Sequence, residues 1–228
     1  MKALILAAGR GERMRPLTDH TPKPLLEVRG KRLIEWHLEA LARAGVREVV
    51  VNTAWLEEQF PAALGDGSRY GVHITYSFEG RDHGGALETA GGIAKALPLL
   101  GDAFWVVSGD VYIPGFAFDP VDATLFVESD ALGELWLVKN APHHPAGDFG
   151  IDADRLASRT AGPKLTWASV GLFRAALFRD IPVGTKMALR PKLERAIDEG
   201  RLRAEFFGGS WTDVGTMERL AALNAPLK

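Results

Sequence analysis

One basic, glycine-containing loop near the amino terminus has the residue types needed to bind phosphate. It follows the apolar run Ala3 to Ala8 and contains Gly9 and Gly11. Small residues directly after a strand let backbone N–H groups close on an anion, because no Cβ blocks the approach. The loop is not a P-loop, since no Gly-Lys-Ser/Thr follows, and Met14 stands where a dinucleotide fingerprint needs its third glycine. The glycines alone would equally mark a tight turn after a strand.

Positive charge favours the phosphate interpretation over a simple turn. Four cationic side chains fall within one stretch of fourteen residues in this region: Arg10, Arg13, Arg15 and Lys23. Lys23 stands between two prolines, which restrict its backbone and its reach. Open α/β sheets bind ligands in loops at the carboxyl ends of their strands. We therefore expect Lys23 to contact a phosphate group.

Two aspartates far apart in the chain could complete a metal site beside this loop. Asp110 follows an apolar run from Phe104 to Val107, and Asp213 follows Trp211. Either alone would most often be a helix cap or a turn residue. Mg²⁺, however, usually takes one or two carboxylates together with substrate phosphates. Beside a phosphate loop, the two aspartates form a plausible Mg²⁺ pair.

Composition excludes several other chemistries. The 228 residues contain no cysteine, so a disulfide framework, a thiolate metal site and a cysteine nucleophile are ruled out. The net charge is 27 − 29 = −2, which disfavours non-specific nucleic-acid binding. The six histidines lack the spacing of zinc ligands, and His37 lies on an apolar helix face, where a buried core histidine is expected.

The elements that must position these residues alternate between strand and helix in the first half of the chain. Short apolar runs predict strands at 2–7, 48–52, 72–78 and 103–108, and helical spacing predicts helices at 33–44 and 89–97. A β-α-β repeat of this kind favours an α/β fold, with a mostly parallel sheet covered by helices on both faces.

Beyond Asp110 the pattern changes. We expect adjacent strands at 123–128 and 134–138, a loop at 142–147, a strand at 165–173, and helices at 191–200 and 216–225. These strands predict mixed or antiparallel additions to the sheet. The first apolar run is too short for a signal peptide or a membrane span, so we expect a cytoplasmic protein.

The phosphate loop as a whole resembles a family signature. From Leu6 the chain reads Leu-Ala-Ala-Gly-Arg-Gly-Glu-Arg-Met-Arg-Pro-Leu-Thr, and Pro-Lys-Pro-Leu follows, ending at Leu25. This pattern is similar to that of the sugar-1-phosphate nucleotidyltransferases. Further matches are Gly109-Asp110, the segment 87–92, and Trp211-x-Asp-Val-Gly-Thr. The stretch 140–149 resembles the short subgroup that uridylylates N-acetylmuramic acid 1-phosphate in bacterial cell-wall recycling.

The resemblance implies roles for particular residues. Arg13 would stabilise the leaving pyrophosphate, Lys23 would lie at the α-phosphate, and Asp110 and Asp213 would hold Mg²⁺ as the cofactor. These four are the expected catalytic residues. The residues implied in nucleotide binding are Ala8, Gly9, Gly11, Glu12, Arg13, Lys23, Glu79 and Leu87. The implied fold is a single Rossmann-like domain, 1–228, with a nucleotide-binding half at 1–110 and a sugar-phosphate-binding half at 111–228.

Residues for the sugar phosphate are less clearly marked. Ser108 would share a strand face with Asp110 and point at the sugar, or be a buried serine bonded to the backbone. Asn140 and Asp148 lie in the stretch that resembles the subgroup, and Asp148 could accept hydrogen bonds from the sugar. Larger relatives carry a Glu-Lys-Pro segment that this chain lacks, so Lys186 is the substitute we expect to grip the sugar phosphate.

The expected reaction is uridylyl transfer from UTP to N-acetylmuramic acid α-1-phosphate, giving UDP-N-acetylmuramic acid and pyrophosphate. Alternatives are another acceptor, such as glucose or mannose 1-phosphate, with another nucleotide donor, or a catalytically silent subunit that senses nucleotide sugars. The expected partners are UTP and a sugar 1-phosphate, with no nucleic acid and no membrane. The sequence leaves the oligomeric state open.

Overall fold

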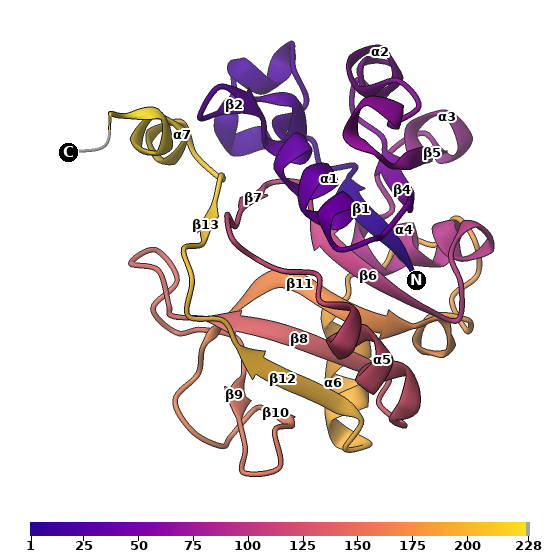
Figure 1. The fold of residues 1–228 in the computed structure, drawn as a ribbon, viewed down its shortest axis with the longest axis vertical. Helices are drawn as coiled ribbons and strands as arrows, with labels where there is room; N and C mark the ends of the chain where they lie inside the picture. Colours follow the sequence, from indigo (N-terminus) through magenta and orange to yellow (C-terminus); the bar gives the residue numbers. More distant parts are fainter. Residues whose placement is uncertain (227–228) are drawn as a thin grey trace.

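A seven-stranded sheet forms the centre of the molecule in the computed structural model, which describes residues 1–226 (Figure 1). The strands lie in the order β12-β8-β11-β6-β1-β4-β5. Their bounds are Lys2–Ala7 (β1), Glu48–Thr53 (β4), His73–Phe78 (β5), Ala103–Ser108 (β6), Gly133–Val138 (β8), Thr166–Arg174 (β11) and Leu202–Phe206 (β12). Only β11 runs against its neighbours β6 and β8, so the sheet is mixed and mostly parallel, as predicted.

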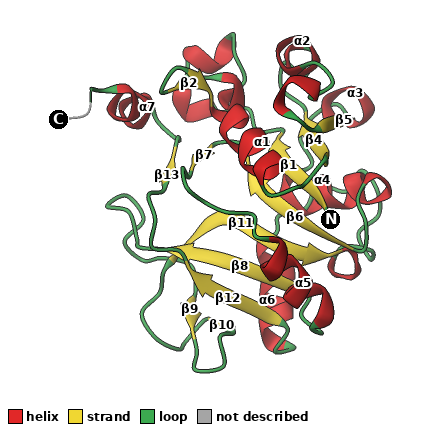
Figure 2. Cartoon of the chain, viewed as in Figure 1, coloured by secondary structure: helices red, strands yellow, loops and turns green. Residues whose placement is uncertain are grey.

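Helices cover both faces of this sheet (Figure 2). Alternate residues of β1 point to opposite sides: Ile5 joins a core with α1 and α5, whereas Leu4 joins a core with α4 and α6. Figure 1 shows α1 and α5 in front of the sheet and α6 behind it. The helices are Leu33–Arg43 (α1), Gln59–Leu64 (α2), Glu79–His83 (α3), Glu88–Ala96 (α4), Pro120–Glu128 (α5), Arg190–Asp198 (α6) and Met217–Asn224 (α7).

The segment 123–128 is a helix, and the prediction of a strand there was wrong. Asp119 caps the first turn of α5, because its carboxylate accepts a hydrogen bond from the backbone N–H of Val121 at 2.8 Å. Pro120 occupies the first helical position, where a missing N–H does no harm. The strand β12, the helices α2 and α3, and the short strand pairs were not predicted.

Three two-stranded ladders complete the structure. They pair β2 (Glu27–Val28) with β3 (Lys31–Arg32), β9 (Gly150–Ile151) with β10 (Ala157–Ser158), and β7 (Val111–Tyr112) with β13 (Thr212–Asp213). The last ladder brings the end of the chain back to the residues just after β6. No helix within residues 1–226 is long and apolar enough to cross a membrane.

His37 is a core residue, as its place on the apolar face of α1 predicted. It is 2% exposed, and its Nε2 lies 2.9 Å from the carbonyl oxygen of Val111. Burial disfavours the imidazolium and lowers the pKa of His37 to about 4. The ring is therefore neutral at physiological pH and helps to hold β7 against α1.

Candidate active site

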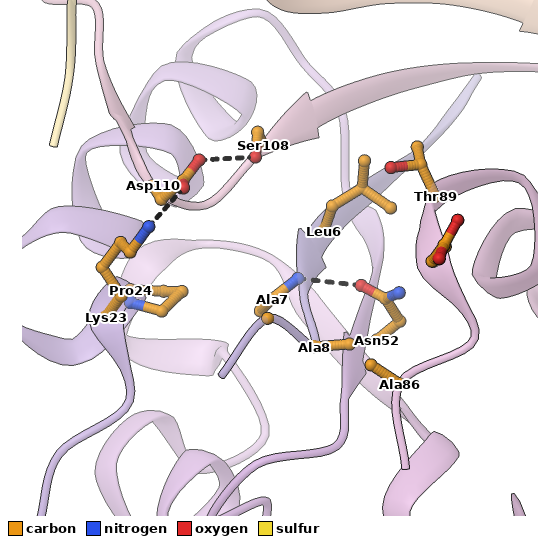
Figure 3. A pocket seen from close by; sticks show the side chains of 12 residues that line it. Leu6, Ala7, Ala8, Lys23, Pro24, Asn52, Ala86, Thr89, Ser108 and Asp110 are labelled. Carbon is orange, nitrogen blue, oxygen red and sulfur yellow. Dashed lines mark hydrogen bonds and ion pairs between the residues drawn. The ribbon is translucent and has the colours of Figure 1, made fainter. Parts of the chain in front are cut away.

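A pocket of about 280 Å³ opens at the carboxyl ends of β1, β4 and β6 (Figure 3). Parallel strands place their carboxyl ends at one edge of a sheet, where open α/β folds bind ligands. The segment Leu6 to Gly9 forms one wall, and the residues around Thr89, at the start of α4, form a second wall. The remaining lining residues are Lys23, Pro24, Asn52, Ser108 and Asp110. Of the residues predicted for the site, Ala8, Gly9, Lys23, Ser108 and Asp110 line this cavity, whereas Gly11, Glu12, Arg13, Leu87 and Asp213 do not.

The phosphate loop is shaped by a residue that must be glycine. Gly11 has φ +72°, in the left-handed region that favours glycine. A Cβ on Gly11 would also lie 2.9 Å from Cγ2 of Thr18, whose hydroxyl donates to the Gly11 carbonyl at 2.9 Å. The conformation of Gly11 is therefore built into the fold of the loop.

The four loop cations have different environments. Arg10 stacks 3.6 Å from the centre of the Trp55 ring and donates to Asp19 at 2.6 Å, and Arg15 donates to the same carboxylate at 2.9 Å. The hydrogen bond from Arg10 holds the pKa of Asp19 below its usual value. Arg13 is exposed, as is Glu12, and its guanidinium pairs with no carboxylate within residues 1–226. Arg10 and Arg15 thus brace the loop, whereas Arg13 is available to an anion.

Lys23 and Asp110 form an ion pair at the edge of the pocket. The Lys23 Nζ donates to Oδ2 of Asp110 at 2.9 Å, and the Ser108 hydroxyl donates to Oδ1 at 2.7 Å (Figure 3). Removal from water alone would raise the pKa of Asp110, but Lys23 and the two hydrogen bonds hold it below its usual value. Asp110 is therefore a carboxylate at neutral pH. The Ser108 hydroxyl bonds to this carboxylate, an arrangement that neither sequence alternative described.

Gly109 lets the lysine segment approach β6 closely. Its N–H donates to the carbonyl of Leu6 at 2.8 Å. A Cβ at this position would lie 3.0 Å from that carbonyl oxygen and 3.1 Å from Cγ of Pro24. The sequence Gly109-Asp110 thus combines a tight backbone contact with a carboxylate at the pocket.

Asp213 reaches the same region through the ladder between β13 and β7. Asp213 is opposite Val111, and the N–H of Val214 donates to the carbonyl of Asp110 at 2.8 Å. The Asp213 Oδ1 contacts the Arg219 guanidinium and lies 2.9 Å from His143 Nε2. Within residues 1–226, this buried oxygen has no partner with hydrogen-bond geometry. The oxygen is nevertheless in ion-pair contact with Arg219, so a metal ion at Asp213 would have to replace or share that contact.

Comparison with known proteins now places this site in a family. The family model described as nucleotidyl transferase matches residues 2–156. The chain belongs to the nucleotidyl transferase family. The match contains the phosphate loop, Lys23 and Asp110, but it ends before Asp213.

Two relatives extend the similarity beyond that range. The chain is 49% identical to an N-acetylmuramate alpha-1-phosphate uridylyltransferase from Neisseria meningitidis, over 99% of this chain and 97% of the relative. It is 33% identical to the protein of the same name from Caulobacter vibrioides, over 99% and 96% of the two chains. Both alignments take in the carboxyl-terminal half of this nucleotidyl transferase.

A solved structure confirms the fold. The crystal structure assigned as a glucose-1-phosphate thymidylyltransferase from Bacillus anthracis superposes with a TM-score of 0.83 at 22% identity. The superposition covers 98% of this chain and 94% of that one. At this identity the comparison speaks for the fold alone.

Glu79 does not line the pocket of this nucleotidyl transferase but lies buried beneath it. Its Oε1 accepts from the Asn52 amide at 2.6 Å, and its Oε2 accepts from the N–H of Leu87 at 2.7 Å. Burial raises the pKa of Glu79, and these two donors oppose the increase. Sequence reasoning missed Asn52, although a polar residue at the end of the apolar strand β4 could have marked it.

Asn140 and Asp148, which were predicted to contact the sugar phosphate, do not line the pocket. The Asn140 amide donates to the carbonyls of Pro145 and Lys164, at 3.0 and 2.9 Å, so it closes the loop 140–147. Asp148 accepts from the N–H of Trp167 at 2.9 Å. A contact between either residue and a sugar stays a prediction.

Lys186 is exposed, but its segment is tied to the pocket wall. The N–H of Met187 donates to the Leu87 carbonyl, and the Met187 carbonyl accepts from Ala90 and Gly91. A Cβ on Gly91 would lie 2.2 Å from the carbonyl oxygen of Thr185. The Lys186 ammonium consequently lies 4.0 Å from Oε1 of Glu88, beside the pocket.

Proposed function

We propose that this nucleotidyl transferase transfers a uridylyl group from UTP to N-acetylmuramic acid α-1-phosphate and releases pyrophosphate. The observation that carries the proposal is the 49% identity to the Neisseria meningitidis uridylyltransferase over nearly the whole of both chains. The product, UDP-N-acetylmuramic acid, is a precursor of the kind that cell-wall recycling requires. A cytoplasmic location follows from the use of UTP.

The halves of the chain divide the substrates in this proposal. In this proposal residues 1–110 bind the nucleotide: Ala8 and Gly9 line the pocket, and the adjoining loop residues Gly11, Glu12 and Arg13 would contact the triphosphate. Residues 111–228 bind the sugar phosphate, with Asp148 and Lys186 as the expected contacts. The two halves nevertheless share one sheet and the cores on both of its faces.

Asp110 and Asp213 fit a Mg²⁺ ion. Both offer hard carboxylate oxygens, and the ladder of β7 and β13 brings their backbones together; Lys23 and Arg219 form ion pairs with them in this structure. When bound, Mg²⁺ supplies charge neutralisation between two anionic substrates. The pairing of Lys23 with Asp110 keeps that carboxylate ionised and ready for such an ion.

Positioning and charge neutralisation are what the side chains contribute to the reaction. The acceptor phosphate is already anionic near neutral pH, so its oxygen can attack the α-phosphorus without a general base. Lys23 lies at the pocket edge, where its ammonium can draw negative charge from the α-phosphate. Arg13 has no competing carboxylate partner and can bind the departing pyrophosphate.

The identity of the acceptor sugar phosphate can be tested separately from the reaction type. The lactyl carboxylate of muramic acid needs a donor or a cation, and Lys139 and His143 lie on the loop that leads to Asp148. A charge-assisted hydrogen bond contributes roughly 1.5–3 kcal/mol, or about a ten- to hundredfold preference. We expect kcat/KM for N-acetylmuramic acid 1-phosphate to exceed that for N-acetylglucosamine 1-phosphate and glucose 1-phosphate by such a factor.

Pyrophosphate release at fixed UTP and Mg²⁺ measures this preference. Mannose 1-phosphate, together with GTP and dTTP as donors, completes the set of substrates. Equal values for the acceptors, or a higher value for glucose 1-phosphate, would remove the muramic acid assignment. Binding of UTP without release of pyrophosphate in any combination would instead indicate a silent sensing subunit.

A further inference from the structure

A chain of three hydrogen bonds connects the end of β1 to the start of α4 beside the pocket. The N–H of Ala7 donates to Oδ1 of Asn52 at 2.8 Å, the Asn52 amide donates to Glu79, and the N–H of Leu87 donates to the other oxygen of Glu79. Asn52 is 2% exposed and Glu79 is fully buried. These bonds join the end of β1 to the residue that precedes α4, although eighty residues of chain separate the two positions.

The two ends of this chain of hydrogen bonds belong to two different walls of the pocket. Ala7 is part of the wall Leu6 to Gly9, and Leu87 stands between Ala86 and Glu88, which line the other wall. Glu88 has φ +60°, a conformation that a non-glycine residue rarely adopts. Because Leu87 is held by Glu79, the backbone at this strained turn is fixed relative to β1.

The fold reserves space for the Asn52 and Glu79 pair. A Cβ on Gly92 would lie 2.5 Å from Oε1 of Glu79 and 2.7 Å from Nδ2 of Asn52. Glycine in a helix is otherwise unfavourable by roughly 1 kcal/mol relative to alanine. Gly92 in α4 therefore has a packing reason, which is to admit these two polar side chains.

We propose that Asn52 and Glu79 are positioning residues of the nucleotide pocket, which set the spacing between the two walls that enclose the nucleoside of UTP. This inference rests on the proposed function of the pocket. Neither carboxylate oxygen of Glu79 faces open solvent, and Asn52 presents only part of its side chain to the cavity. Glu79 acts on the nucleotide through the backbone of Leu87 and through Asn52, which itself lines the cavity.

The direction of each hydrogen bond allows a specific test, in which the amide and the carboxylate are exchanged between positions 52 and 79. Glu79→Gln places an amide N–H against either the Asn52 amide or the Leu87 N–H, and Asn52→Asp places a carboxylate against Glu79. In the double variant Asn52→Asp/Glu79→Gln every donor again faces an acceptor. Ala7 and the new glutamine amide both donate to the aspartate, and Leu87 donates to the glutamine oxygen.

We expect each single variant to raise the KM for UTP about tenfold or more, because a buried donor or acceptor is left mismatched. The kcat at saturating UTP and the KM for the sugar phosphate should change much less. The double variant should recover most of the affinity for UTP. Gly92→Ala should also raise the KM for UTP, although alanine is the better helix former.

Glu134→Gln is the matched control, because Glu134 is another buried carboxylate, 4% exposed on β8 and away from the pocket. It should leave the KM for UTP unchanged. Thermal unfolding with and without UTP measures binding in every folded variant. If neither single variant folds, recovery of folding and UTP binding in the double variant supports the exchange, and failure of the double variant overturns it.

Other outcomes separate this inference from the proposed function. A parent protein that binds UTP, with single variants that bind it equally well, would overturn the positioning role alone. A loss of kcat with an unchanged KM for UTP, or a double variant no better than the worse single variant, would do the same. A parent protein that binds no nucleotide would overturn both proposals.

Discussion

Arg13 differs from the two neighbouring arginines in its ion pairing. Arg10 and Arg15, three and two residues away, share the carboxylate of Asp19, whereas Arg13 is exposed without a carboxylate partner in the described chain. Side chains that brace a loop affect stability when they are removed. Removal of a side chain that contacts only substrate lowers turnover instead, so mutation can separate the two roles.

We predict that Arg13→Ala lowers kcat by about 10²–10³-fold, because one preorganised contact to charge that develops in the transition state is typically worth that much. The melting temperature should stay within about 1 °C of the parent value, since exposed positions of this kind rarely change stability. Arg15→Ala, in the same loop, is the control and should lower kcat far less. Pyrophosphate release and thermal unfolding measure the two effects, and a parent-like kcat in Arg13→Ala would contradict the assignment.

The first residues of α5 specify that this segment folds as a helix. Only Ala123 and Phe126 in α5 are buried, at a spacing of three, whereas the apolar residues Val121, Leu125 and Val127 are exposed. The apolar residues therefore surround the helix and conceal its periodicity. What specifies a helix here is the carboxylate of Asp119 together with the proline that follows it.

We predict that Asp119→Ala lowers the free energy of unfolding by about 1 kcal/mol, the usual contribution of an N-cap. The cap lies on a helix that does not line the pocket, so the kcat of pyrophosphate release should be unchanged. Glu128→Ala at the other end of α5 is the control, because an acidic side chain near a helix carboxyl terminus contributes no favourable dipole interaction. Denaturant unfolding of the two variants tests this, and an equal effect of both would show that the cap is unimportant.

Elements with a clear period were predictable, and the others were not. The apolar runs of β1, β4 and β6 and the amphipathic helix α1 followed directly from residue spacing. The run at 123–128 has β-branched and aromatic residues that favour a strand, and the decisive Asp-Pro start lies outside it. The alternation of Leu202 and Ala204 could have revealed β12, but its partner β8 is far away in sequence.

The candidate site was predictable to the extent that its residues lie in one loop. Gly9 and Lys23, which line the pocket, belong to one local motif, so their spacing was informative. The burial of Glu79 and its bond to Asn52 arise from packing between β4, α3 and α4, which no local spacing encodes. The hydrogen bond from Asn140 to the carbonyl of Lys164, 24 residues away, could not be predicted for the same reason.

At the scale of the whole molecule, the site is complete only when the end of the chain folds back. Asp213 and Asp110 are 213 − 110 = 103 residues apart, and the ladder of β13 and β7 joins them. The helix α7 then packs near the phosphate loop, since Leu220 and Leu223 contact a cluster that contains Met14 and Val214. The Asn224 amide closes this arrangement by donating to the Glu27 carbonyl at 2.9 Å. The carboxyl-terminal segment thus connects the proposed metal ligands Asp110 and Asp213 to the loop that we propose binds the triphosphate.

Because of this connection, we predict that stabilisation of the UTP complex by Mg²⁺ requires Asp213, a residue of the carboxyl-terminal half. With UTP present, Mg²⁺ should raise the melting temperature of the parent, because ligand at a hundredfold excess over its Kd stabilises a protein by about 2.7 kcal/mol. For a chain of this size that corresponds to roughly 5 °C or more. Asp213→Asn should abolish the Mg²⁺-dependent part of the shift and most of the turnover, while the shift with UTP alone persists. Asp154→Asn, an exposed aspartate on the loop between β9 and β10, should behave like the parent. A full Mg²⁺ shift in Asp213→Asn, or full turnover of the parent in a chelator, would show that the two carboxylates do not form a metal site.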